Sequence, residues 1–138
     1  MTGPRSLADP IRSAYHAGSM ADMHERSPRL AVHHKVWLDA GRRFALGDGG
    51  VVLLRAIDAG GSIRSAAARA GWSYRHTLAY LDNAERSLGF RLVVRSRGGS
   101  ERGGTTLTPR ARDFVRRYDR FRRRLDHALR DFYDAAFG

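Results

Sequence analysis

Apolar and polar residues alternate near the start of the chain, in the segment AVHHKVWLDAGRRFALG that covers residues 31–47. The alternation continues up to residues 39–41, Asp-Ala-Gly, which are typical of turns, and Phe44 and Leu46 resume it beyond them. Alternation on both sides of turn residues predicts a small β-hairpin. The next apolar run, Val51 to Ile57, has glycines at both ends and predicts a mostly buried helix that ends at Gly60-Gly61.

A helix-turn-helix is predicted over residues 62–88. Ser62 is a suitable N-cap for a first helix over residues 63–70, in which four alanines leave a smooth surface. Gly71 can take the left-handed conformation that turns the chain, and Ser73 is a suitable N-cap for a second helix. A smooth first helix can pack closely on the second, as a helix-turn-helix requires.

The second of these helices has two different faces. One face is directed to the core and carries Thr77, Leu81, Ala84 and Leu88. The other face begins with side chains that can form hydrogen bonds, namely Ser73, Tyr74, Arg75 and His76, followed by Ala79. A recognition helix meets base edges with this end, where arginine can bind guanine and the helix N-terminus favours a phosphate. The simpler alternative is a solvated polar surface.

A wing is predicted directly after this helix, over residues 91–108. Short strands near residues 90–95 and 105–108 enclose the loop RSRGGSERGG. Its glycines let the backbone approach a duplex, and its arginines can contact phosphates or a narrow minor groove. The candidate contacts in the wing are Arg95, Arg97, Gly98, Gly99, Arg102 and Gly103. The loop lacks the GK[ST] ending of a phosphate-binding P-loop.

The remaining residues, from Pro109 to about Ala136, predict one helix roughly 40 Å long. Its apolar residues follow a heptad spacing, and Val115 and Leu129 widen the stripe. The candidate dimerisation residues are Phe114, Tyr118, Phe121, Leu125 and Phe132. One short domain cannot cover so long a stripe, so a second copy of the chain is expected, although a helix folded wholly onto its own domain is the alternative. Parallel pairing would oppose Arg117 to the partner's Arg122, which favours an antiparallel or offset arrangement. The arginines of residues 116–124 are expected to form a solvated face, and phosphate contact near the wing is the less favoured alternative.

The charge of the chain adds to the nucleic-acid interpretation because it is uneven. The formal net charge is +11; residues 1–61 carry 8 basic and 6 acidic side chains, and residues 62–138 carry 17 and 8. A basic excess suits a polyanion, since phosphate neutralisation releases counterions. An arginine-rich genome is the alternative explanation, because 24 of the 25 basic residues are arginine.

Other classes of protein are disfavoured by what the sequence lacks. There is no cysteine and no apolar run near the roughly 18 residues of a membrane span, so a cytoplasmic protein is expected. Residues 1–28 are interpreted as a flexible tail. His33 and His34 are neighbours on the predicted strand and point to opposite faces, so a metal site is not expected. No catalytic constellation or cofactor fingerprint is present, so an enzyme is not expected.

At this point the segment from LLRAIDAGGSIRSAAARAGWSYRHTLAYL to TTLTPRARDF resembles a known family. It is similar to the N-terminal winged helix of ModE-type molybdate-responsive repressors, a relative of the LysR-type DNA-binding domain, over about residues 30–121. The narrower marks are Ser73-Tyr74-Arg75 and the double-glycine wing before Leu107-Thr108. The resemblance implies a dimer that binds a palindromic operator, with Ser73, Tyr74 and Arg75 in the groove and the loop 98–104 on the backbone or minor groove.

Two departures limit what the resemblance implies. Residues 76–78, His-Thr-Leu, and Ala111 differ from the usual family pattern, so the operator sequence cannot be transferred. The chain ends at Gly138, so we expect a single-domain form without molybdate-binding domains and without a cofactor, and molybdate as an effector is the less favoured expectation.

The sequence thus predicts a mainly α protein with small β-hairpins, in which a winged helix-turn-helix at residues 29–108 precedes a long dimerisation helix at residues 109–138. The expected function is that of a homodimeric, sequence-specific transcription regulator that binds double-stranded DNA, with Ser62 among its contacts. The alternative is a winged-helix interaction module that works with a separate sensor protein.

Overall fold

The structure is a computed structural model that describes residues 29–96 and 104–138. The chain divides into two units, Met1–Val32 and His33–Gly138. Within the first unit, residues 29–32 have no regular secondary structure, and the tail predicted over residues 1–28 lies outside the described residues. The second unit contains all the elements below.

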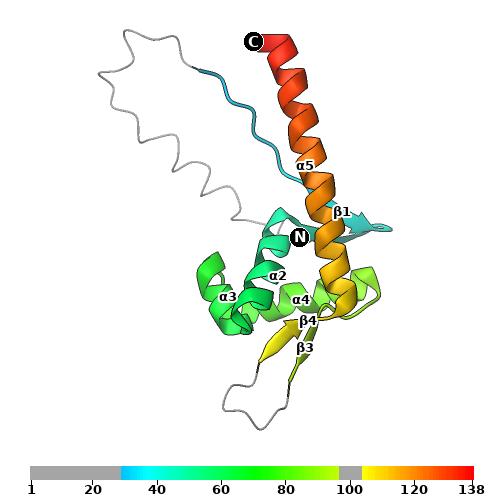
Figure 1. Cartoon of the computed structure of the whole chain (residues 1–138). Coiled ribbons are helices and arrows are strands. Elements are labelled where there is room, and N and C mark those ends of the chain that lie inside the picture. The colour runs from blue at the N-terminus through cyan, green and yellow to red at the C-terminus, as the bar shows by residue number, and fades with distance from the viewer. Residues whose placement is uncertain (1–28, 97–103) are drawn as a thin grey trace, which may run out of the picture. The chain divides into compact units, whose positions relative to one another are not determined.

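The second unit is mostly helical, as Figure 1 shows. Its elements are β1 (Trp37–Ala40), β2 (Arg43–Gly47), α2 (Asp48–Gly60), α3 (Ile63–Ala70), α4 (Tyr74–Leu88), β3 (Val93–Arg95), β4 (Thr105–Leu107) and α5 (Pro109–Phe137). In the described residues β1 pairs with β2 and β3 with β4, each time antiparallel. The predicted fold class, mainly α with small hairpins and a long C-terminal helix, is confirmed.

Local chemistry explains where the helices begin and end. The hydroxyls of Ser62, Ser73 and Thr108 each accept a hydrogen bond from a backbone N–H in the first turn of α3, α4 and α5. Gly61 and Gly71 follow α2 and α3 with φ angles of 68° and 72°, which a side chain would strain. The sequence predicted the caps at Ser62, Ser73, Gly61 and Gly71, whereas the Thr108 cap was not predicted.

The first hairpin is shorter than predicted and contains a bulge. Residues 33–36 precede β1, so the two histidines are not on a strand. Leu38 pairs with Leu46 and Asp39 with Phe44, which leaves Ala45 as an extra residue in β2. Ala45 and Leu46 are therefore both buried, and the predicted alternation from Phe44 to Leu46 is broken between them.

Helix α2 begins at Asp48, three residues before the predicted apolar run, and takes the glycines at 49 and 50 into its first turn. Gly50 is buried because α4 lies against it. A Cβ atom at this position would come within 2.7 Å of Cε1 of Tyr80 and 2.8 Å of Cδ1 of Leu46. Gly50 therefore permits close packing of α2 on α4 and β2. Glycines before an apolar run are typical of a turn, but residues 49 and 50 lie inside the helix.

The core surrounds α2. Its side chains come from β2, α2, α3, α4, the wing and the first half of α5, and the fully buried members include Leu46, Leu53, Leu54, Ile57 and Leu92. From α5, Ala111, Val115 and Tyr118 are buried in the same cluster. The core thus fixes the first half of α5 on the domain.

Charged side chains extend the contact between α2 and α5. Within the described residues, three ion pairs join the two helices: Asp58 with Arg112, Arg55 with Asp119, and Asp48 with Arg122. Residue numbers fall along α2 as they rise along α5, so the two helices are antiparallel. The prediction that residues 116–124 present only solvated arginines is wrong for Arg122, which this ion pair holds against the domain.

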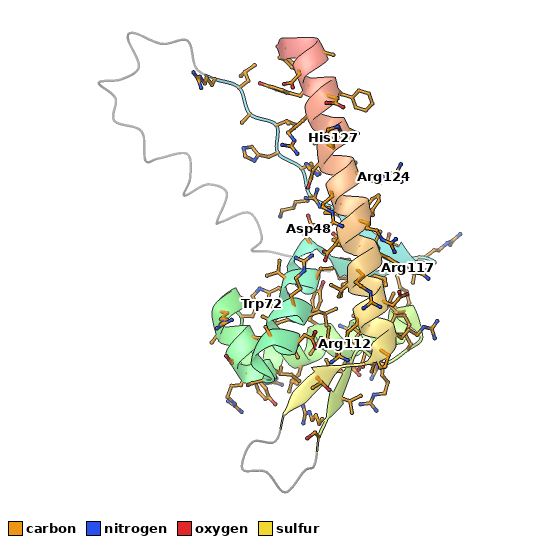
Figure 2. All side chains as sticks on the ribbon, viewed as in Figure 1. Asp48, Trp72, Arg112, Arg117, Arg124 and His127 are labelled. Atoms are coloured by element: carbon orange, nitrogen blue, oxygen red, sulfur yellow. The ribbon has the colours of Figure 1, made fainter. Side chains whose placement is uncertain are left out.

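Asp48 is the centre of this contact, beside the middle of α5 in Figure 2. Its carboxylate accepts hydrogen bonds from Arg122 Nε at 2.9 Å, from the Tyr118 hydroxyl and from Val36 N at 3.2 Å. Burial alone would raise the pKa of Asp48, but these hydrogen bonds outweigh it and hold the pKa below its usual value. Burial and the bond to Asp48 raise the pKa of the Tyr118 hydroxyl. Arg122 also contacts Asp126 and His34.

The first prediction concerns acid stability. Because the folded pKa of Asp48 is lowered, its stabilisation is complete above the unfolded pKa and is lost as the pH falls through the folded one. Asp48→Asn should therefore lower the free energy of unfolding at pH 7 and lower it less at pH 3. The expected loss at pH 7 is only about 1–2 kcal/mol, because the carboxylate is one-third exposed to solvent. Urea unfolding at both pH values measures this difference.

Asp82→Asn is the matched control, because Asp82 forms an exposed ion pair within α4. It should change stability little at either pH. An equal loss for Asp48→Asn at pH 7 and pH 3 would show that the charge of Asp48 does not stabilise the fold.

The second prediction concerns Gly50. Gly50→Ala should destabilise the fold by about 1–2 kcal/mol, because the new methyl group must displace Tyr80 and Leu46. Gly60→Ala, at the other end of α2, meets no atom within 4 Å and should be neutral or stabilising. Thermal unfolding of both variants decides the matter, and a stabilising Gly50→Ala would refute the close contact.

Candidate nucleic-acid interface

The exposed face of α4 begins directly after the turn that joins α3 to α4. Thr77, Leu81 and Ala84 are buried, as predicted, so the opposite face of the helix is directed to solvent. Arg75 and Ala79 lie on that exposed face. Among the described residues, no carboxylate lies within ion-pair distance of Arg75. Its guanidinium is therefore free for a ligand, and Ala79 leaves space beside it.

Asn83 shares this exposed face and was missed by the sequence analysis. It follows Ala79 by four residues and His76 by seven, a spacing that places all three on one side of a helix. That spacing is the signal that would have identified it. Its amide can both donate and accept hydrogen bonds, as contact with a base edge requires.

Ser62 and Ser73 have a structural role that does not use their hydroxyl protons. Ser62 Oγ accepts from Ser65 N at 3.1 Å, and Ser73 Oγ accepts from His76 N at 3.0 Å. Each hydroxyl can still donate its own proton to an oxygen outside the chain. Both predicted residues thus lie at helix N-termini, where a phosphate is favoured.

His76 lies at one end of a row of aromatic rings. Its ring meets that of Trp72 edge-on, with centroids 5.0 Å apart, and Trp72 lies 5.0 Å from Tyr80. Tyr80 in turn contacts Phe44 of the first hairpin, and its hydroxyl accepts from Gly47 N at 3.1 Å. Burial raises the pKa of Tyr80 against the opposing effect of that hydrogen bond. The row fixes the start of α4 on the body, so His76 is exposed but held in place.

Tyr74 is less exposed than a free reader of base edges would be. It is half-buried against the core, and the guanidinium of Arg64 lies over its ring at 4.2 Å from the centroid. Arg64 lies in the first turn of α3 and was not singled out by the sequence analysis. No spacing rule joins two residues ten positions apart across a turn, so only the fold brings this pair together.

The wing is attached to the helix-turn-helix at its base. Arg95 pairs with Thr105, and Thr105 N donates to Gly61 O, in the turn before α3, at 2.8 Å. Arg95 is exposed, as predicted. The other predicted wing contacts lie outside the described residues; they are Arg97, Gly98, Gly99, Arg102 and Gly103.

Two further side chains hold the wing to its neighbours. Glu85 of α4 accepts a hydrogen bond from Leu92 N at 2.6 Å, just before β3. The Thr108 hydroxyl donates to Arg91 O at 2.7 Å and also caps α5. The wing, α4 and α5 are therefore connected by directed hydrogen bonds, which gives the candidate interface a fixed geometry.

The predicted dimerisation stripe on α5 divides in two. Tyr118 is 5% exposed and belongs to the domain's own core, so it is not on the surface that a second copy could reach. Phe114 is half-buried and packs on Phe90. Phe121 and Phe132 are 45% and 73% exposed and Leu125 is half-buried, so the outer part of the stripe remains uncovered.

The charges on α5 do not support the predicted antiparallel or offset pairing of two copies. That prediction was based on repulsion between Arg117 and the Arg122 of a second copy. Arg122 is neutralised by Asp48 and Asp126, and Arg117 pairs with Asp113 at 2.9 Å. These ion pairs remove the repulsion, so the charges do not select an orientation.

The described residues contain neither a metal-binding cluster nor a membrane-spanning helix. Across residues 29–96 and 104–138, no cluster of three or more His, Asp or Glu side chains is arranged to hold a metal ion. His34 instead lies 3.2 Å from Asp126 and contacts Arg122. None of the described helices is long and apolar enough to cross a membrane.

Comparison with known proteins identifies the fold. No protein-family model and no curated protein sequence matches the chain. Among solved structures, the chain is similar to the crystal structure of the CbnR_DBD–DNA complex, with 22% sequence identity and a TM-score of 0.51. The similarity covers 62% of this chain and 93% of that chain. Together with the order of elements, this likeness shows that the chain has a winged helix-turn-helix fold.

Proposed function

We propose that this chain is a transcription regulator that binds double-stranded DNA, with the N-terminal end of α4 in the major groove and the wing on the adjoining backbone. The observation that carries the proposal is the outward face of α4, where Arg75 is exposed beside Ala79. The solved structure with the same fold is that of a complex with DNA, which supports the same ligand here.

The chemistry of this face fits a base edge better than a bare phosphate. An arginine near the start of a recognition helix can donate two hydrogen bonds to O6 and N7 of guanine. Ala79 has no side chain beyond Cβ, so the helix can lie deep in the groove. The hydroxyls of Ser62 and Ser73 and the two helix N-termini can then bind phosphates, which position the protein without reading sequence.

The distribution of neutralised charge supports the same surface. The arginines that pair with α2, namely Arg112 and Arg122, serve the fold. Within the described residues, Arg75 and Arg95 have no carboxylate within ion-pair distance. These two belong to α4 and the wing, so unpaired positive charge is available at the proposed DNA surface. In the same part of the chain, the first hairpin and α5 carry unpaired arginines as well, such as Arg43 and Arg124.

We further propose that the regulator is a homodimer. Phe121, Leu125 and Phe132 form an apolar stripe on the outer part of α5, and exposure of such a stripe is costly in water. A two-fold dimer would present two α4 helices to half-sites about one turn of DNA apart, and so would bind a palindromic operator. The ModE-type resemblance supports this assembly, and it leaves the operator sequence and any effector open.

The same stripe favours one other function, a winged-helix module that binds a separate sensor protein. Arg120, Arg123 and Arg124 lie beside Phe121 and Leu125 of the stripe, which suits an acidic amphipathic partner helix. Salt dependence distinguishes this function from the first, because binding through phosphates weakens steeply as salt rises.

The central test of DNA binding uses Arg75→Ala. Duplexes that the chain retains are selected from fragments of its source genome, and Kd is measured by fluorescence anisotropy. Arg75→Ala should weaken binding to a selected site by about 1–3 kcal/mol and binding to random DNA much less. Arg86→Ala is the control, because Arg86 lies on the same helix but pairs with Asp82 at 3.0 Å. Equal losses of Arg75→Ala on both DNAs would contradict base reading.

The dimer is tested by Phe132→Glu. A charge in the apolar stripe should convert the dimer to monomers in sedimentation equilibrium and should weaken operator binding. The monomer should stay folded, with an unchanged far-ultraviolet circular dichroism spectrum, because Phe132 is largely exposed in the single chain. Val52→Glu, at an exposed apolar residue of α2, should leave the dimer intact. A wild-type chain that is monomeric at all concentrations would refute the dimer.

A further inference from the structure

The contact between Arg64 and Tyr74 joins the two helices of the helix-turn-helix near the proposed DNA surface. The guanidinium carbon of Arg64 lies 4.2 Å from the centre of the Tyr74 ring. Arg64 is the second residue of α3, and Tyr74 is the first residue of α4. A stacked guanidinium keeps its N–H donors at the edge of the stack, so Arg64 can still bind an anion.

Apart from the stack on Tyr74, the surroundings of Arg64 do not balance its positive charge. The N-terminal turn of a helix carries a partial positive charge, which disfavours a cation there. The first turn of α3 contains no acidic residue to offset it. Among the described residues, no carboxylate lies within ion-pair distance of Arg64. The site thus concentrates positive potential: a guanidinium, a helix N-terminus and the free proton of the Ser62 hydroxyl.

The position of this site relates it to both parts of the proposed interface. Thr105 N of the wing donates to Gly61 O at 2.8 Å, so the base of the wing adjoins the start of α3. Tyr74 places the other side of Arg64 against the start of α4. A duplex that contacts both the wing and α4 must therefore pass its backbone across the start of α3.

We propose that Arg64 binds the DNA backbone phosphate that lies between the wing and α4, and that Tyr74 is a positioning residue that holds the Arg64 guanidinium there. This inference rests on the proposed function and refines it. The ring of Tyr74 does the positioning, so its hydroxyl makes no required contact with a base. Arg64 contributes affinity on every sequence, whereas Arg75 contributes to the choice of sequence.

The test measures Kd on a selected duplex and on random DNA over a range of salt concentrations. Arg64→Gln should weaken binding about tenfold on both DNAs and reduce the salt slope by about 0.9 for each bound protomer, the value for one lost phosphate contact. Tyr74→Leu should have a similar effect, and the double variant should lose little more than either single one. Tyr74→Phe keeps the ring and should bind as the wild type does.

Arg69→Gln is the matched control, since Arg69 is an exposed arginine in the last turn of the same helix. It should leave the salt slope unchanged. An unchanged slope for Arg64→Gln would overturn the phosphate contact, and a Tyr74→Phe as weak as Tyr74→Leu would overturn the positioning role. Wild-type binding that does not depend on salt would instead refute the proposed function. Circular dichroism of each variant verifies that it is folded, and Arg64→Gln and Tyr74→Phe, which remove little buried surface, keep the test decisive if Tyr74→Leu unfolds.

Discussion

The antiparallel contact between α2 and α5 is the interaction on which the rest of the structure depends. Helix α2 lies in the core and contacts α3, β2, β4 and α5, and its Gly50 lies against Tyr80 of α4. Helix α5 carries the apolar stripe that we assign to a second copy. Asp48 joins the two, because it begins α2 and binds both Tyr118 and Arg122 of α5. Its carboxylate therefore continues the contact that buried side chains and two other ion pairs make between α2 and α5.

This placement matters for the proposed function. Two α4 helices can enter successive turns of one duplex only if the helices that join the copies are held rigidly on their domains. Buried side chains hold the first half of α5, and ion pairs to α2 continue the contact to Arg122. Beyond that point the domain no longer covers the apolar stripe, where Phe132 is largely exposed.

Much of the fold could be predicted from the sequence, because its signals are local. Ser62, Ser73 and Thr108 cap helices whose apolar spacing is regular, and Gly61 and Gly71 end them. The failures all involve contacts between distant residues. The glycines before Val51 read as a turn, yet Gly50 is needed because Tyr80 of α4 packs on it. The bulge at Ala45 has no signal in the alternation itself.

The candidate site shows the same division. Exposure of Arg75 and burial of Thr77 follow from helical spacing alone. The stack of Arg64 on Tyr74 does not, since it depends on how α3 meets α4. Likewise, a heptad spacing cannot distinguish residues that pack on the same domain, such as Val115 and Tyr118, from residues left for a partner. Arg122 looked like a solvated arginine because its partner Asp48 is 74 positions away.

Our central claim is that the chain contacts DNA through the start of α3, the start of α4 and the wing. Nuclear magnetic resonance titration of the ¹⁵N-labelled chain with a selected duplex tests this claim most directly. The largest shifts should occur at the amides of residues 62–65, 73–79 and 95–105. Shifts confined to the outer half of α5, with those three segments unchanged, would contradict it.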